Sequence, residues 1–286
     1  MTGDSDSISF RIVADLLASR TGQRIDEGRR WRIPSALAGV FRQRGISNLD
    51  QLVCLLAQPG EATLADEVVE ALLNNETYFF RDRMMFDQLA ERVLPSLAQA
   101  RANRRRLSIW SAGCSTGQEP LSLAMQLRDR PDLWDGWHID ILATDISGKA
   151  INAARQGVYS QFEVQRGLGV TQMLKYFTET PRGWKVDPEL RSRIRYRVQN
   201  LLDPMIEGQK FDLILCRNVL LYFDPGTRSR AFDRISSAMA SDGWLMLGAG
   251  ETANGHTRAL RPEPDSINLH RPARHSEPDD QRRARP

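Results

Sequence analysis

The stretch that decides the fold is IWSAGCSTGQEP, residues 109–120. An apolar run ends there in a turn of small residues, and apolar residues at helical spacing follow from Leu121 to Leu127. This order predicts a strand, a tight loop and a helix. The small residues of the loop, Gly113 among them, let a ligand approach the backbone closely, and N–H groups at the start of a helix can face it. A plain structural turn would have the same spacing.

A second strand is predicted over 138–144, and it ends at Asp145. In doubly wound α/β folds an acidic residue at this place accepts hydrogen bonds from ribose hydroxyls. Asp145 follows Gly113 by roughly thirty residues, a little later than in the usual dinucleotide fingerprint. The alternative is that Asp145 caps the helix expected to start near Ser147.

The strands and helices alternate along the second half of the chain. This βαβ rhythm predicts a parallel sheet covered on both faces. The segment from about 150 to 193 interrupts it and predicts a helix followed by a small inserted subdomain, partly β. Ser266 to His270 could add a last strand. The strands of the main sheet are expected at 107–112, 138–144, 194–199, 211–217 and 243–248.

Polar and aromatic residues follow the strand expected at 211–217. Ligands in open α/β sheets bind beyond the carboxyl ends of the strands, so Asn218 and Tyr222 would lie beside Gly113 and Asp145. The alternatives are a local turn hydrogen bond for Asn218 and helix–sheet packing for Tyr222.

Residues 8–72 carry apolar residues at helical spacing and no acid–base constellation, which predicts a helical domain for binding or packing. Arginines are frequent in the first fifty residues, and a second cluster of arginines lies at 101–106. A basic surface of this kind attracts an acidic partner, either nucleic acid or an acidic protein helix. A solvated surface without a partner is the alternative. The two clusters are Arg20, Arg24, Arg29, Arg30, Arg32, Arg42 and Arg44, and then Arg101, Arg104, Arg105 and Arg106.

Bulk properties exclude several classes of protein. The chain has 286 residues and a net charge of +3, enough length for two domains. No apolar run approaches the roughly 18 residues that span a bilayer, and the polar, acidic N-terminus is unlike a secretory signal. Three widely separated cysteines form no metal-ligand cluster. We therefore expect a cytoplasmic protein with no bound metal and no membrane insertion.

Five motifs occur in the order typical of one family. On these motifs the chain resembles the CheR family of chemoreceptor glutamate methyltransferases, which use S-adenosylmethionine, from the helical N-terminal part to about residue 250. The motifs are NETYFFR at 75–81, SAGCSTGQEP at 111–120, ATDI at 143–146, NL at 200–201 and CRNVLLYFD at 216–224.

The resemblance implies an α/β fold. A Rossmann-like S-adenosylmethionine-dependent methyltransferase domain at 107–271 would contain an inserted β subdomain at about 157–193. An all-α N-terminal domain for receptor recognition would precede it at 1–73, and a linker and helix at 74–106 would contribute to the cofactor pocket. We expect a disordered tail at 272–286, because it is polar, charged and rich in Pro and Arg.

The resemblance also implies roles near the reacting end of the cofactor. Asn75, Thr77 and Arg81 would contact its methionine end or the substrate carboxylate. Glu119 would orient it near its amino group. Arg81 and Tyr222 would lie nearest the transferred methyl group and act as the catalytic residues.

The other implied roles concern the nucleoside end. Gly113 would lie in the cofactor loop, and Asp145 would hold the ribose hydroxyls. Asn200 and Leu201 would frame the adenine. Further residues would line the pocket at the strand end: Arg217, Asn218 and Val219.

The implied function is methylation of glutamates in the acidic methylation helices of chemoreceptors, for adaptation in chemotaxis-type signalling, with S-adenosylhomocysteine as the second product. One alternative is a non-catalytic module that binds this cofactor or a second messenger. A nucleic-acid methyltransferase is less consistent with the sequence, because the turn at 218–222 lacks the proline-rich pattern of amino-group methylases.

The chain departs from the family pattern at three places. Gln118 stands where a second acid is frequent. Residues 248–252, GAGET, replace a His-Ser-Glu run that many members carry, which puts local substrate contacts in doubt. The turn at 181–184 is short, so we expect no docking of a receptor peptide tether.

Overall fold

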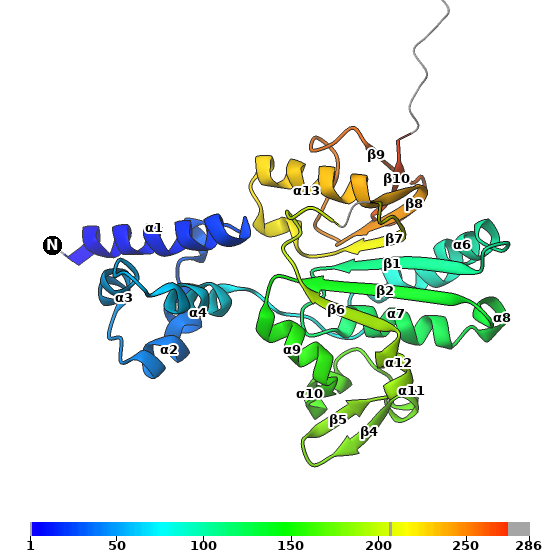
Figure 1. Cartoon of the computed structure of the whole chain (residues 1–286), viewed down its shortest axis with the longest axis horizontal. Helices are drawn as coiled ribbons and strands as arrows, with labels where there is room; N and C mark the ends of the chain where they lie inside the picture. The colour runs from blue at the N-terminus through cyan, green and yellow to red at the C-terminus, as the bar shows by residue number, and fades with distance from the viewer. Residues whose placement is uncertain (1, 206–207, 274–286) are drawn as a thin grey trace, which may run out of the picture.

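The computed structural model describes residues 2–205 and 208–273. Its N-terminal part consists of α1 (Thr2–Thr21), a short 3-10 turn (Glu27–Arg29), α2 (Arg32–Arg44), α3 (Leu49–Leu56) and α4 (Ala62–Leu72). These helices are amphipathic and bury their apolar faces against one another in a core of their own that includes Val13, Leu37, Leu52 and Val68. In Figure 1 this helical part lies beside one end of the central sheet.

The chain then crosses to the sheet through an extended linker and a helical stretch. That stretch is α5 (Arg83–Gln88), one π-helical turn (Leu89–Val93) and α6 (Leu94–Ala100). Phe86, Leu89, Val93 and Leu94 are buried, which is the inward face that the apolar spacing indicates.

A seven-stranded sheet forms the centre of the second part, in the order β6-β2-β1-β7-β8-β10-β9. The pairs from β6 to β8 are parallel, and β10 pairs antiparallel with β8 and β9. The predicted α/β class with a largely parallel sheet is confirmed. The strands are β1 (Arg106–Ala112), β2 (His138–Asp145), β6 (Ile194–Val198), β7 (Phe211–Cys216), β8 (Met239–Leu247), β9 (Leu260–Pro262) and β10 (Leu269–Pro272).

Helices cover both faces of this sheet (Figure 1). One face packs against α7 (Gln118–Arg128), α8 (Pro131–Trp134) and α9 (Gly148–Gln156), and the other against α13 (Pro225–Ala238). Two separate apolar clusters result, one around Ile109 and Leu213 and one around Trp110 and Ile214. Consecutive strand residues thus point to opposite buried faces, as expected for a central parallel sheet.

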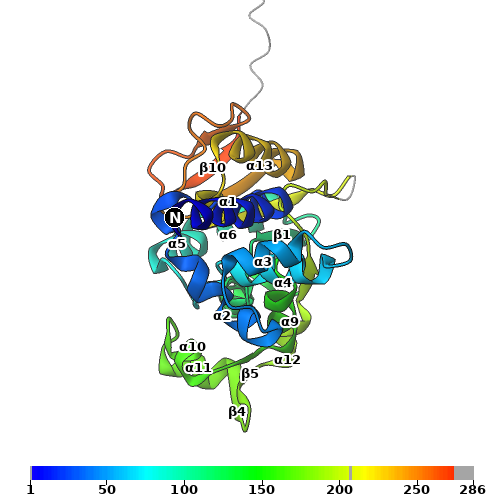
Figure 2. The ribbon, with the colours of Figure 1, turned by 90° about the vertical axis from the view of Figure 1, so that its left-hand side faces the viewer.

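The inserted segment forms a small antiparallel sheet in the order β3-β5-β4. A two-residue turn joins β4 to β5. Figure 1 and Figure 2 show this subdomain below the main sheet, at a lower level than the helical part. Its elements are β3 (Val158–Tyr159), α10 (Gln161–Gln165), α11 (Val170–Tyr176), β4 (Phe177–Thr180), β5 (Gly183–Val186) and α12 (Pro188–Ser192).

The C-terminal strands differ from the sequence expectation. The strand expected at 243–248 begins at Met239, because its pairing with β7 continues across an irregularity in register. The last strand lies at Leu269–Pro272 instead of 266–270, and β9 at Leu260–Pro262 was not anticipated. Of the tail expected to be disordered at 272–286, Pro272 ends β10 and the N–H of Ala273 donates to the carbonyl of Ala259, so the expectation is wrong for these two residues. Residues 274–286 lie outside the described part. The other expected domain limits remain predictions. No described helix has the length and apolar character needed to cross a bilayer.

A carboxylate from the helical part connects that part to the start of α9. Glu70 on α4 accepts hydrogen bonds from the hydroxyl of Ser147 and from the backbone N–H groups of Gly148 (3.1 Å) and Lys149 (3.4 Å). These donors lie at the N-terminus of α9, where N–H groups have no helical partner and negative charge is favoured. The first turn of α9 is therefore held by a residue from another part of the chain.

Replacing Glu70 by Ala should loosen this contact. Loss of a helix-terminal acceptor costs about 1 kcal/mol, so hydrogen exchange at residues 147–151 should become several-fold faster. Glu67→Ala is the control, because Glu67 pairs with Arg44 inside the helical part and its loss should leave that exchange unchanged. Equal exchange in the Glu70 variant and the wild type would contradict the assigned contact.

Candidate functional site

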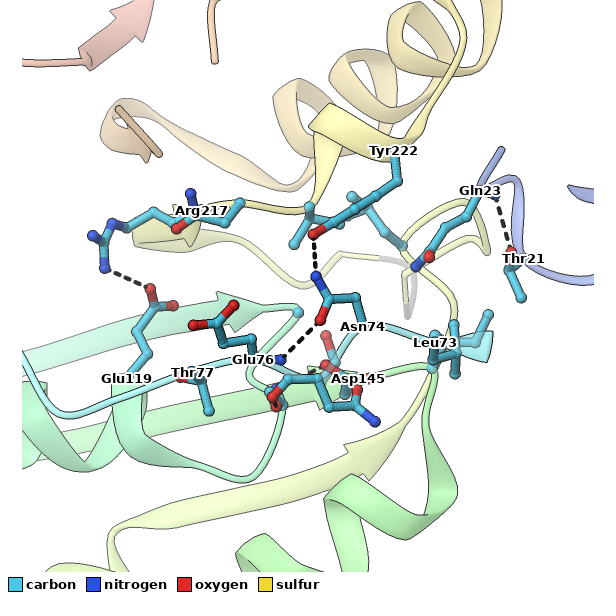
Figure 3. A pocket seen from close by; sticks show the side chains of 18 of the residues that line it. Thr21, Gln23, Leu73, Asn74, Glu76, Thr77, Glu119, Asp145, Arg217 and Tyr222 are labelled. Carbon is cyan, nitrogen blue, oxygen red and sulfur yellow. Dashed lines mark hydrogen bonds and ion pairs between the residues drawn. The ribbon is translucent and has the colours of Figure 1, made fainter. Parts of the chain in front are cut away.

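A cavity lies at the carboxyl edge of the main sheet, under the linker between the two parts of the chain (Figure 3). The structure brings every predicted site residue to it, although the residues come from five separate segments. The residues are Asn75, Thr77, Arg81, Gly113, Glu119, Asp145, Asn200, Leu201, Arg217, Asn218, Val219 and Tyr222.

The loop after β1 is tightly constrained. Gly113 has a φ of +81°, and a Cβ atom there would lie 2.2 Å from Cγ2 of Val219. The N–H groups of Gly113 and Cys114 both donate to the carbonyl of Thr144, at 2.8 and 2.9 Å. Only glycine fits this backbone, and the loops after β1, β2 and β7 are thereby packed against one another.

Asp145 ends β2 and is only 8% exposed. Its two carboxylate oxygens accept hydrogen bonds from the N–H groups of Ser115 (2.8 Å) and Ser147 (2.9 Å). A carboxylate has about four acceptor positions, so it can still accept from a ligand. Ser147, whose hydroxyl accepts from the N–H of Ala150, is the N-cap of α9. The capping alternative for Asp145 is therefore wrong, although Asp145 supports the turn.

Glu119 and Arg217 form a buried ion pair at the inner end of the cavity (Figure 3). Nη1 of Arg217 lies 3.0 Å from the Glu119 carboxylate, which also accepts from the Ser111 hydroxyl at 2.8 Å. Nη2 of Arg217 donates to Asp82 and to the carbonyl of Arg81. Removing one partner of such a pair costs about 3–5 kcal/mol. The bonds from Nη2 of Arg217 tie the end of the linker to the sheet.

The charge state of this site favours a ligand that donates hydrogen bonds. Burial raises the pKa of the Glu119 carboxyl, and Arg217 only partly offsets that rise. Burial also raises the pKa of the Asp145 carboxyl. Holding both groups ionised at neutral pH therefore costs free energy in the ligand-free protein. Donor groups of a ligand would recover part of that cost.

The linker forms the roof of the cavity. Asn74 donates from Nδ2 to the Tyr222 hydroxyl at 2.6 Å, so opposite walls meet across the cavity (Figure 3). The carbonyl of Asn75 accepts from the Ser115 hydroxyl at 2.7 Å. Arg81 donates to the carbonyl of Glu76 at 3.0 Å and remains partly exposed. This guanidinium is therefore available to a molecule that reaches the cavity from outside.

The aromatic residues of the linker divide between roof and core. Tyr78 lines the cavity. Phe79 and Phe80 are 0% and 5% exposed, and the Phe79 ring packs edge-on against Tyr159 at 5.2 Å and Phe177 at 5.4 Å. Their burial anchors the linker between the sheet and the inserted subdomain.

Several lining residues have no signal in the sequence. Thr21, the last residue of α1, and Gln23 just after it line the cavity, and Gln23 forms an isolated bridge with Phe223. The side-chain amide of Asn200 approaches the carbonyl of Thr21 at 3.5 Å. The helical part thus completes a wall of the site. The signal that could have found Asn74 is its place beside the NETYFFR motif.

The residues present fit an adenosyl ligand with an amino-acid tail. Asp145 has acceptor capacity left for ribose hydroxyls, and buried Leu201 offers an apolar surface to a base. Glu119 and Arg217 present one charge of each sign to an ammonium and a carboxylate. Nε of Arg217 is buried and has no hydrogen-bond partner among the residues that the structure describes, so a donor remains for an anionic group.

Comparisons with known proteins agree with this geometry. The family model described as CheR methyltransferase, SAM binding domain, matches residues 75–267. Chemotaxis protein methyltransferase 1 of Pseudomonas aeruginosa is 37% identical over 249 residues, covering 86% of this chain and 90% of that protein. Chemotaxis protein methyltransferase Cher2 of Pseudomonas putida is 35% identical over 258 residues, covering 89% and 92%. The matched domain contains every predicted site residue, and its cofactor is S-adenosylmethionine.

Replacing Asp145 by Asn should weaken binding of S-adenosylhomocysteine. Hydrogen bonds to a charged acceptor contribute about 1.5–3 kcal/mol, so the Kd from calorimetry at neutral pH should rise about 10- to 100-fold. Asp140→Asn is the control, since Asp140 lies in the same strand and pairs with Arg195 at the surface. An unchanged Kd for the Asp145 variant would refute the ribose role.

Proposed function

This chain belongs to the CheR methyltransferase family, and we propose that it methylates glutamate side chains of chemoreceptors, forming methyl esters. Membership of the family makes it an S-adenosylmethionine-dependent methyltransferase. The proposal that the acceptor is a glutamate carboxylate rests on the position of Arg81, which lines the cavity together with Tyr222. A partly exposed arginine there suits an incoming carboxylate.

We assign the inner cavity to the cofactor. Asp145 would hold the ribose, and Asn200 and Leu201 would hold the adenine. Glu119 would bind the ammonium group. The remaining residues expected to contact or enclose the cofactor are Asn75, Thr77, Arg81, Gly113, Arg217, Asn218 and Val219.

The chemistry asks for positioning more than for proton transfer. When bound, S-adenosylmethionine supplies an electrophilic methyl group. The substrate carboxylate has a pKa of about 4.3 and is ionised at neutral pH, so the site needs no strong general base. Arg81 would hold one carboxylate oxygen and leave the other free to react. Tyr222, fixed by Asn74, would close the reacting end, and exclusion of water and alignment can lower the barrier by about 7–11 kcal/mol in the best cases.

The proposed partner is the acidic, helical methylation region of a cytoplasmic receptor domain, and we place the enzyme in the same compartment. Support comes from the basic segment before α2. The Arg29 guanidinium lies 5.7 Å from the centre of the Tyr222 ring, and neighbouring Trp31 is 73% exposed. A basic, partly apolar surface thus borders the cavity. The two-residue β4–β5 turn is the reason that we propose no tether docking.

The function is tested by the product formed. The purified protein is incubated with methyl-labelled S-adenosylmethionine and a receptor cytoplasmic fragment, RNA or no substrate. We expect label on the receptor fragment only, released by mild base as a methyl ester requires, and a rate that falls with added salt. Base-stable label on RNA would support the nucleic-acid alternative. Cofactor binding without label on the fragment would support a non-catalytic module.

Arg81→Ala should separate turnover from cofactor affinity. Loss of the group that orients the substrate carboxylate should lower kcat/KM for the fragment about 100-fold, while the Kd of S-adenosylhomocysteine changes much less. Arg83→Ala is the control, because Arg83 is an exposed arginine paired with Asp87 on α5. Near-normal turnover in the Arg81 variant would rule out the orienting role.

A further inference from the structure

One buried carboxylate beside the site is not explained by the roles above. Glu251 follows β8, is 7% exposed and lies behind the cavity wall. Its carboxylate accepts hydrogen bonds from four backbone N–H groups: Oε1 from Val219 (2.9 Å) and Leu220 (2.7 Å), and Oε2 from Asn218 (2.8 Å) and Gly248 (2.7 Å).

Three of these donors are consecutive residues of the loop that follows β7. Residues 218–220 lie beyond the strand pairing of β7, which ends at Cys216. Their N–H groups therefore have no sheet partner, and a buried N–H group needs an acceptor. A carboxylate is an acceptor-only group, and its charge shortens and strengthens each bond. Glu251 thus supplies the hydrogen-bond acceptors that the sheet does not provide for these three N–H groups.

The geometry of this loop needs such support. Asn218 has a φ of +62°, in the left-handed region that non-glycine residues seldom adopt. A Cβ atom on Gly248 would lie 2.8 Å from the Asn218 nitrogen and 2.8 Å from the Glu251 carboxylate. The loops after β7 and β8 are therefore in close contact, with the carboxylate between them.

The same loop carries residues that line the cavity from the β7 side. They are Asn218, Val219 and Tyr222, and Arg217 precedes them. Val219 packs over Gly113, and the Tyr222 hydroxyl accepts from Asn74. A shift of this loop would therefore move Val219 and Tyr222 together.

We propose that Glu251 is a positioning residue for methyl transfer, because it fixes the backbone of residues 218–220 and through it the places of Val219 and Tyr222. Glu251 is not among the residues that line the cavity, so it would act through this loop. The role in catalysis rests on the proposed function, whereas the role of Glu251 in holding the cavity wall formed by residues 218, 219 and 222 does not. The position also explains the GAGET sequence: two small residues separate Gly248 from a glutamate that turns inward.

The test compares Glu251→Gln and Glu251→Ala with the wild type below the unfolding temperature of each variant. Glutamine keeps the shape but turns an N–H₂ group toward two of the donors. Three quantities are measured: hydrogen exchange of residues 217–222, the Kd of S-adenosylhomocysteine, and kcat with the receptor fragment. Glu263→Ala is the control, because Glu263 is a partly buried carboxylate that pairs with Arg92 and not with the loop.

We expect faster exchange confined to residues 217–222 and the β8 end, a Kd raised about tenfold, and kcat lowered about 100-fold, as displacement of reacting groups by about 1 Å can cause. Saturating S-adenosylhomocysteine should slow the exchange again.

If Glu251→Ala does not fold, the result for Glu251→Gln decides whether the proposal holds. A folded Glu251→Gln protein with wild-type Kd and exchange overturns the proposal. Absent receptor methylation by the wild type would reject the proposed function, and the Kd and exchange data would still judge Glu251.

Discussion

Three buried carboxylates at the carboxyl edge of the sheet impose the constraint on which the site depends. A carboxylate removed from water is costly unless it is paired or hydrogen-bonded. Glu119 is paired with Arg217, Asp145 accepts from two backbone N–H groups, and Glu251 accepts from four. Because these partners lie in the loops after β1, β2, β7 and β8, the hydrogen bonds and the ion pair that offset the cost of burial also assemble the cavity.

The three carboxylates differ in how many acceptor positions they leave free for a ligand. The acceptor positions of Glu251 are largely occupied by backbone groups, which suits a structural support. Asp145 and Glu119 keep exposure to the cavity and raised pKa values, which suits groups that a ligand stabilises. The linker adds to this arrangement, because Arg217 also binds the carbonyl of Arg81. The proposed cofactor site and the arginine proposed to face the substrate thus belong to one hydrogen-bonded unit.

Much of this architecture could be predicted from local sequence pattern. The strand, glycine loop and helix around Gly113 follow from apolar spacing and small residues, and motif order indicated the residues that line the cavity. The start of β8 was missed because a register irregularity extends its pairing beyond the apolar run. The roles of Glu70 and Gln23 could not be predicted, since their partners lie about 80 and 200 residues away in sequence and periodicity reports only local structure. Glu251 was visible only as part of a departure from the family pattern.

The most direct test is a crystal structure of the protein with S-adenosylhomocysteine. The account predicts ribose hydroxyls on the Asp145 carboxylate, the amino-acid end beside Glu119 and Arg217, and the sulfur directed toward Arg81 and Tyr222. A ligand bound elsewhere, or bound in this cavity with its ribose away from Asp145, would contradict it.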